Sequence, residues 1–158
     1  MTKMPMIQFF VPGLPATSGS KRPFIYKSKK DGKQRVAMVP DNKRQKPWMS
    51  TVSVAAGEVF NGSVLRGPVA LTVQYFFPRP KSHYGNGRNA GIVKDSAPKH
   101  HISKPDLSKL TRAIEDALSG IVWKDDSQVI SHIESKDYAA NGEATGALVT
   151  ISEDERRG

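Results

Sequence analysis

KPDLSKLTRAIEDALSGIVWKDDSQV, residues Lys104–Val129, carries the pattern that decides the fold. Its first half has apolar residues at helical spacing, and Gly120 ends that pattern. The second half leads into an apolar segment rich in β-branched residues. The stretch predicts a helix over 107–118, a short return and a strand over 128–138. The apolar stripe of the predicted helix consists of Leu107, Leu110, Ile114, Ala117 and Leu118.

The same stretch concentrates carboxylates, although the chain as a whole has a formal charge of +9. Residues 1–104 hold 18 Lys/Arg and 4 Asp/Glu, whereas residues 105–158 hold 6 Lys/Arg and 11 Asp/Glu. A basic surface beside an acidic cluster is typical of a protein that holds a polyanion and performs metal chemistry on it. Ordinary solubility charge is the simpler alternative. The five carboxylates are Asp106, Glu115, Asp116, Asp125 and Asp126.

Length and composition limit the class of protein. A chain of 158 residues suits one domain, 1–158, with a core that needs no disulfide. The absence of cysteine excludes disulfides and thiolate metal sites. The opening MTKMPMIQFFVPG lacks the long apolar region of a signal peptide, and no apolar run approaches the ~20 residues of a membrane span. We expect a cytoplasmic protein, without a membrane partner or organic cofactor.

The remaining patterns predict one more helix and four more strands. The helix is expected over 44–60, and the strands over 6–11, 35–39, 69–77 and 147–151. Asn141-Gly142 is typical of a turn that returns the chain as a hairpin. Two segments without periodicity, about 12–46 and 78–104, are predicted to be basic loops. The sequence therefore predicts an α/β (α+β mixed) single domain, with a small mixed β-sheet packed against two main helices.

The carboxylates have both a structural and a chemical interpretation. Asp106 precedes the helix, where it can simply serve as an N-cap, and Asp125-Asp126 is typical of a polar turn. If the return segment brings Asp126 beside Asp106, the carboxylates repel unless a cation neutralises them. Oxygen ligands without cysteine suit Mg²⁺ or Mn²⁺. In a basic protein, such a site indicates metal-assisted phosphodiester hydrolysis.

Glu115 lies on the helix with two alternatives. It can form a surface ion pair with Arg112, three residues earlier, or it can supply a carboxylate to the metal site. Ser108, seven residues before Glu115, points nearly the same way on a helix. Asp116 points about 100° further round and is expected to make a structural hydrogen bond.

This stretch, extended to Ile130, resembles the signature of the RusA-type Holliday-junction resolvases, which are common in prophages. The signature begins a helix with Asp-x-Asp-Asn-Leu, places a Lys within the helix, and continues through Asp-Ala-Leu, Gly and an aromatic residue to Asp-Asp-x-Gln-Val. The positions that match in register are Asp106, Leu110, Asp116-Ala117-Leu118, Gly120, Trp123 and Asp125-Asp126-x-Gln128-Val129.

The resemblance implies a crossover junction endodeoxyribonuclease. Members of that family are homodimers that bind four-way DNA junctions and nick two strands symmetrically with Mg²⁺ held by aspartates. By position, Asp106 is the first metal aspartate, Asp126 the late one, and Asp125 its neighbour. Arg112 stands where the family has its catalytic Lys. The implied function is resolution of Holliday junctions during DNA recombination and repair.

Two departures from the signature leave three alternatives open. Ser108 stands where the second family aspartate is expected, and Lys109 where Asn is usual. Either Glu115 compensates as a metal ligand, or metal binding is weak, or the chain binds junctions without cutting them. General binding of RNA or duplex DNA is a weaker third function.

Basic residues are expected to contact DNA phosphates. Phe24 and Tyr26 can stack on bases at a junction centre or pack against the sheet, and Trp123 is expected in the core. His83, His100 and His101 lack zinc-ligand spacing and are expected in a loop that faces phosphates. The predicted DNA contacts are Lys21, Arg22, Lys27, Lys29, Lys30, Lys104, Lys109 and Lys124.

Overall fold

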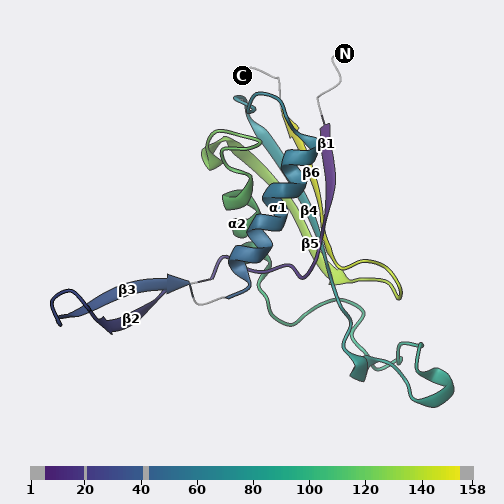
Figure 1. Cartoon of the computed structure of the whole chain (residues 1–158). Coiled ribbons are helices and arrows are strands. Elements are labelled where there is room, and N and C mark those ends of the chain that lie inside the picture. Colours follow the sequence, from purple (N-terminus) through teal and green to yellow (C-terminus); the bar gives the residue numbers. More distant parts are fainter. Residues whose placement is uncertain (1–5, 20, 41–42, 154–158) are drawn as a thin grey trace, which may run out of the picture.

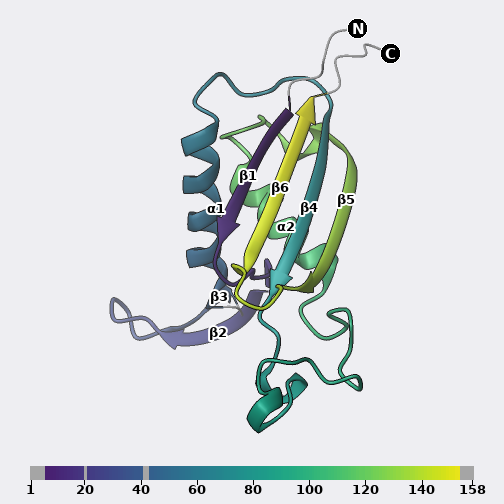
Figure 2. The same ribbon diagram turned by 90° about the vertical axis from the view of Figure 1, so that its right-hand side faces the viewer.

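A computed structural model of the chain describes residues 6–19, 21–40 and 43–153. Its centre is a four-stranded sheet in the order β1–β6–β4–β5. β6 is antiparallel to both of its neighbours, whereas β4 and β5 are parallel. Figure 2 shows the four strands side by side. They are β1 (Met6–Pro12), β4 (Val69–Phe77), β5 (Val129–Tyr138) and β6 (Gly146–Glu153).

Two helices, α1 (Gln45–Val59) and α2 (Leu107–Leu118), lie on the same face of this sheet (Figures 1 and 2). Both were predicted, α1 to within one residue at each end and α2 at both bounds. The side chains of α2 that pack into the core include Leu110, Ile114 and Leu118, all fully buried. The mixed architecture of a small sheet with two main helices is therefore confirmed.

The path from β4 to β5 positions the candidate site. Parallel neighbours cannot be joined by a tight turn, so the chain crosses over between them, and α2 forms part of that crossover. β4 alternates buried and less buried residues along VALTVQYFF, which fixes the side of the sheet that faces the helices. α2 therefore begins after the end of β4 and ends shortly before the start of β5.

The final strand was predicted to return as a hairpin beside 128–138, and this prediction is wrong. β6 instead pairs with β1 and β4, and so occupies an inner position in the sheet. The physical reason is composition: GALVTISE supplies three buried side chains for an inner strand, whereas VISHIESKDY has an exposed, charged pattern that suits an edge. Gly146 begins β6 at φ +150°, and a Cβ there would collide with the Val11 carbonyl oxygen.

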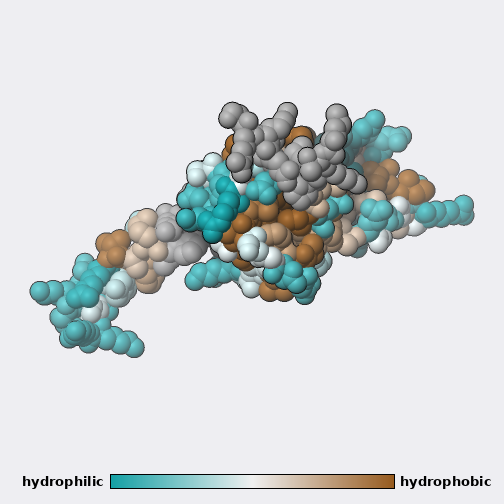
Figure 3. Space-filling model, turned by 90° about the horizontal axis from the view of Figure 1, so that it is seen from above, coloured by the Kyte–Doolittle hydropathy of each residue, from teal (hydrophilic) through white to brown (hydrophobic). Residues whose placement is uncertain are grey.

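The first predicted basic loop contains the strand expected over 35–39, which is confirmed as β3 (Gln34–Pro40), and a second strand, β2 (Lys21–Lys27), that was not predicted. The two strands form an antiparallel hairpin of their own, which projects away from the core (Figure 1). Ile25 is 64% exposed and Met38 57% exposed, so this arm leaves apolar side chains uncovered. In Figure 3 the arm has hydrophobic residues along its length and a hydrophilic tip. We call residues 21–40 the hairpin arm.

The second predicted loop has a defined path. It contains two short 3₁₀ helices, η1 (Lys81–His83) and η2 (Gly87–Asn89). The Arg79 guanidinium lies 4.2 Å from the centre of the Tyr138 ring and donates to the Pro98 carbonyl oxygen at 2.7 Å. These contacts tie the end of the segment back to the sheet. No helix in the described ranges is both long enough and apolar enough to cross a membrane.

Candidate active site

The edge strand β5 carries polar side chains toward α2. His132, Glu134 and Lys136 are spaced two residues apart and therefore share one face of the strand. The His132 imidazole contacts the Glu115 carboxylate, and Glu134 accepts a hydrogen bond from the Thr111 hydroxyl. These two contacts connect β5 to the C-terminal half of α2, at Glu115, and to its middle, at Thr111.

Lys136 continues this row to the start of α2. Its ammonium donates to the carbonyl oxygens of Ser103 and Pro105, at 2.6 and 2.7 Å. Because Pro105 directly precedes Asp106, this contact fixes the backbone that enters the helix. Three alternate positions of β5 thus contact α2 at Glu115 and Thr111 and the segment that enters it at Ser103 and Pro105.

A buried hydrogen-bond chain lies behind this row. The Tyr75 hydroxyl is 2.9 Å from the Thr111 hydroxyl oxygen, and Thr111 donates its proton to Glu134. Tyr75 is therefore the donor of the first bond. Burial raises the pKa of Tyr75, and the charges of Glu134 and Glu115 raise it further, so the phenol keeps its proton.

Asp126 is held in place by a buried indole. Trp123 is fully buried, as predicted, and its Nε1 donates to Asp126 Oδ1 at 2.9 Å. The following 3₁₀ helix, η3 (Asp126–Gln128), is capped by Asp125, whose Oδ1 accepts from the Ser127 amide at 2.8 Å. Gln128 Oε1 in turn accepts from the Asp125 amide. This turn presents Asp126 at a fixed position, and one oxygen of Asp125 is committed to capping it.

Three carboxylates gather near the C-terminal half of α2: Glu115, Asp116 and Asp126, which we call the acidic group. Burial raises the pKa of Glu115, and the charges of Asp126 and Asp116 raise it further, against the lowering effect of His132. Burial and the charge of Asp126 also raise the pKa of Asp116, while Arg112 opposes them. Burial and mutual repulsion therefore disfavour the charged forms of Glu115 and Asp116, a cost that His132 and Arg112 do not fully offset.

Asp106 lies at the opposite end of the helix. It precedes α2 without making a side-chain capping bond, its side chain is 62% exposed, and its carboxylate lies 3.8 Å from Lys109 Nζ. Asp106 and Asp116 are ten residues apart, roughly 15 Å along a helix axis. The structure therefore places the carboxylates in two groups along α2. Among the described residues, no three Asp, Glu or His side chains are grouped as a metal site.

The alternatives for Glu115 and Asp116 can now be compared with their contacts. Glu115 contacts His132, and the charge of Arg112 acts on Asp116 instead of forming the expected pair with Glu115. Among the described residues, Asp116 interacts with Asp126 and Arg112 through charge and forms no side-chain hydrogen bond, so its expected structural bond is not found. Ser108 is exposed on the first turn of α2.

The predicted phosphate contacts lie in three places. Lys27, Lys29 and Lys30 are exposed at the end of the hairpin arm, while the side chains of Lys21 and Arg22 lie outside the described residues. Lys104 and Lys109 are exposed near the start of α2, and Lys124 is exposed beside the acidic group. Cations therefore flank both ends of α2.

The aromatic and imidazole side chains are placed differently from some expectations. Phe24 and Tyr26 are exposed on the hairpin arm and do not pack against the four-stranded sheet. His101 is buried and stacks on Phe77, so it does not face solvent phosphates as expected. His100 remains exposed, with Nδ1 3.1 Å from an Asp137 oxygen.

The sequence interpretation missed His132 and Glu134 as members of this region. Their signal was present, because both lie on one face of the predicted strand 128–138 together with Lys136. It was not used because the partner of that face depends on how the strand packs.

Comparison with known proteins adds a family assignment to this geometry. Residues 14–151 match the family described as Endodeoxyribonuclease RusA. The chain is also similar to an uncharacterized protein, YqaN, of Bacillus subtilis (strain 168), with 29% identity over 136 residues. That alignment covers 86% of this chain and 90% of the relative. The match to the family includes α2, Trp123 and Asp126, and extends well beyond the stretch that first carried the resemblance.

Proposed function

Because the chain belongs to the RusA family of endodeoxyribonucleases, we propose that it resolves Holliday junctions by paired symmetric nicks, as a Mg²⁺-dependent homodimer. Members of this family depend on a divalent metal in general. The observation that carries the proposal is the position of Asp126, fixed by the Trp123 indole beside two carboxylates whose pKa values are raised. A hard cation suits such a fixed acidic group, because it would favour the charged forms of the carboxylates.

The donor set fits Mg²⁺. This ion is usually bound by one or two carboxylates together with waters and substrate phosphates, so it does not require a preformed cage of three protein ligands. In the proposal, Asp126 and Glu115 hold the ion, whereas Asp106, roughly 15 Å away along α2, is too far to be a ligand of the same ion. When bound, the ion polarises the scissile phosphate and lowers the pKa of the attacking water.

Other residues orient the site and the DNA. Asp125 holds the turn that presents Asp126, and Trp123 fixes one carboxylate oxygen so that the other is available. Arg112 is exposed on the same helix and stabilises negative charge on the phosphate, a role that its guanidinium can fill without acting as a proton donor. Lys104, Lys109 and Lys124 contact the flanking phosphates.

A homodimer follows from the symmetry of the proposed reaction. Two symmetric nicks need two sites related by a two-fold axis, and one chain offers one acidic group. Exposed apolar side chains on the sheet face opposite the helices support this proposal. Phe10 alternates with the buried Phe9 and Val11, and Ile133, 70% exposed, alternates with His132 and Glu134, which contact α2. Burial of such side chains against a second copy would stabilise a dimer.

The test is a nicking assay on a synthetic four-way junction and a matched linear duplex, with Mg²⁺ and then Mn²⁺. Wild type should cut the junction at symmetric positions, and Asp126→Asn and Glu115→Gln should abolish cutting while junction binding persists. Glu58→Gln, which removes an exposed glutamate from α1, is the matched control and should cut normally. Full activity of Asp126→Asn would refute the assigned site.

Ser108 favours a second function, junction binding without cutting. A hydroxyl is a poor substitute for a carboxylate toward Mg²⁺, and Ser108 is exposed where the family signature has aspartate. If wild type binds the junction tightly and does not cut it, Ser108→Asp becomes the decisive variant. Gain of symmetric cutting by Ser108→Asp would identify a binding protein with a degraded metal site.

A further inference from the structure

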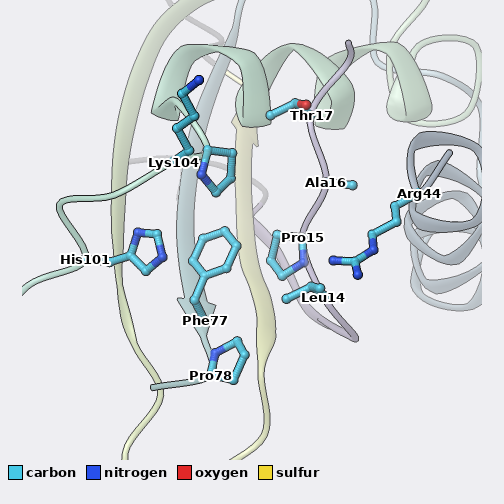
Figure 4. A pocket seen from close by; sticks show the side chains of 10 residues that line it. Leu14, Pro15, Ala16, Thr17, Arg44, Phe77, Pro78, His101 and Lys104 are labelled. Atoms are coloured by element: carbon cyan, nitrogen blue, oxygen red, sulfur yellow. The ribbon is translucent and has the colours of Figure 1, made fainter. Parts of the chain in front are cut away.

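A cavity of about 380 Å³ lies next to the start of α2. The loop after β1 forms one side, with Pro15 and Ala16, and the end of β4 forms another, with Phe77. The segment that enters α2 closes it, with His101 and Lys104 (Figure 4). The cavity is distinct from the acidic group, which lies toward the other end of the helix.

One wall of the cavity is aromatic and rigid. The rings of Phe77 and His101 stack with their centres 4.5 Å apart and an angle of 27° between their planes. Tyr138 supports His101 from a centre-to-centre distance of 5.0 Å. Figure 4 shows the rings of Phe77 and His101 on one side of the cavity, with Leu14 and Pro15 on the other. A flat wall facing small apolar side chains suits a planar ring system, because every nucleobase has a π-face that can stack.

His101 also offers a polar atom without a protein partner. The residue is 8% exposed, and its Nδ1 is buried with no hydrogen bond to any described residue. Buried polar atoms in folded proteins are nearly always satisfied, so an unsatisfied one in a cavity wall calls for a ligand or an ordered water. Burial lowers the pKa of His101, which keeps the ring neutral at pH 7.

Cations border the same cavity. Two cationic side chains line it: Arg44, which directly precedes α1, and Lys104. Lys104 lies two residues before Asp106, and Pro105 between them also lines the cavity. An aromatic slot bordered by a guanidinium and an ammonium combines the two groups that recognise a nucleotide, a stacking surface for the base and positive charge for the phosphate.

We propose that this cavity receives one unstacked nucleobase of the DNA strand that passes the start of α2, with Lys104 and Arg44 contacting its flanking phosphates. The proposal rests on the proposed function, because it takes DNA as the ligand. A branched junction suits it, since extracting a base from its stack is easiest where pairing and stacking are already interrupted. The cavity would then select which strand position lies at the acidic group.

The test combines a variant that fills the cavity with DNA that lacks one base. Ala16→Leu places extra methyl groups in the slot, and Ala140→Leu, in the exposed turn after β5, is the matched control. Junction affinity is measured by fluorescence anisotropy for an intact junction and for a series with one abasic nucleotide at successive positions. A thermal melt checks that Ala16→Leu is folded. If it is not, Leu14→Trp, at a lining position that is partly exposed, replaces it.

We expect one abasic position to weaken wild-type binding by about tenfold, the range of a base–aromatic stack. Ala16→Leu should weaken binding of the intact junction by a similar factor and have no further effect at that one abasic position, because the two changes remove the same contact. Ala140→Leu should bind as wild type does.

Additive effects of Ala16→Leu and the abasic nucleotide at every position would overturn the base pocket while leaving junction binding intact. A change in oligomeric state of Ala16→Leu, measured by light scattering and without such coupling, would assign the cavity to protein contact and would also overturn it. Failure of wild type to bind any junction would instead refute the proposed function.

Discussion

The Asp126 carboxylate accepts a hydrogen bond from Trp123 Nε1 at Oδ1 and is also a proposed metal ligand, and two substitutions can distinguish these roles. Asp126→Ala removes the acceptor and leaves the N–H of a fully buried indole unsatisfied. Asp126→Asn keeps an oxygen acceptor at the same position and removes only the charge. The two variants therefore share the loss of the proposed metal ligand but differ in their effect on the fold.

The magnitude follows from the buried donor. An unsatisfied buried N–H costs about 1–3 kcal/mol, and in a domain of this size each kcal/mol shifts Tm by roughly 2–4 °C. Loss of the Asp126 charge acts in the opposite direction, because that charge raises the pKa of Glu115 and of Asp116. Asp126→Asn should therefore melt at or slightly above the wild-type temperature, and Asp126→Ala should melt about 2–10 °C lower.

Differential scanning fluorimetry at pH 7 measures these shifts, and the nicking assay on the same samples should show no cutting by either variant. The dependence of Tm on pH is a second measurement. A raised carboxyl pKa in the folded state means that the folded chain binds the proton more tightly, so this contribution to stability grows as pH falls. Asp126→Asn should gain less stability than wild type on acidification toward pH 5. Equal Tm values for the Asn and Ala variants would refute the role assigned to the indole.

Three further outcomes are expected. Thr111→Val should destabilise the fold by about 1–3 kcal/mol in urea unfolding, because the buried tyrosine hydroxyl and the β5 carboxylate lose their shared partner, whereas Thr111→Ser should stay close to wild type. Burial lowers the pKa of His101, so the unfolded chain binds the proton at a higher pH than the folded chain does, and wild-type stability should fall as pH drops below about 6.5. In thermal melts across pH, His101→Phe should lose this dependence of Tm on pH, whereas His100→Gln should keep it. Gly146→Ala should lower stability by at least about 1–3 kcal/mol because of its φ of +150° and the collision of the new Cβ, while Gly62→Ala, in open space, should not, as urea midpoints would show.

The elements that could be predicted are those whose signal is local. α2 was predicted at both ends because its apolar stripe, an aspartate before it and Gly120 after it all lie within one short stretch. The neighbours of β6 could not be predicted, since strand pairing depends on which segments compete for the inner places of a sheet. One strand of the hairpin arm was predicted over 35–39, but its partner β2 was missed, because the lysines and the arginine in and around KRPFIYK made that segment resemble a charged loop.

The residues of the candidate site also fall into those that local sequence patterns indicate and those that depend on tertiary packing. Asp126 and Glu115 were named from spacing on a helix and in a turn, which are local features. His132 lies 17 residues from Glu115, and Glu134 lies 23 residues from Thr111, so their contacts arise only when β5 packs beside α2. The cavity at His101 is likewise lined by segments that are distant in sequence, so no short sequence pattern could predict it.

The hairpin arm has one more consequence, which concerns the freedom of the chain to vary in length. Lys21 pairs with Pro40, so the polypeptide departs from the domain and comes back at the same place. Removing cross-strand pairs from the tip would shorten the arm by about 3.4 Å per pair without moving any strand of the four-stranded sheet. The length of the arm, and with it the reach of its proposed phosphate contacts, can thus change by insertion and deletion alone, independently of the proposed chemistry at Asp126.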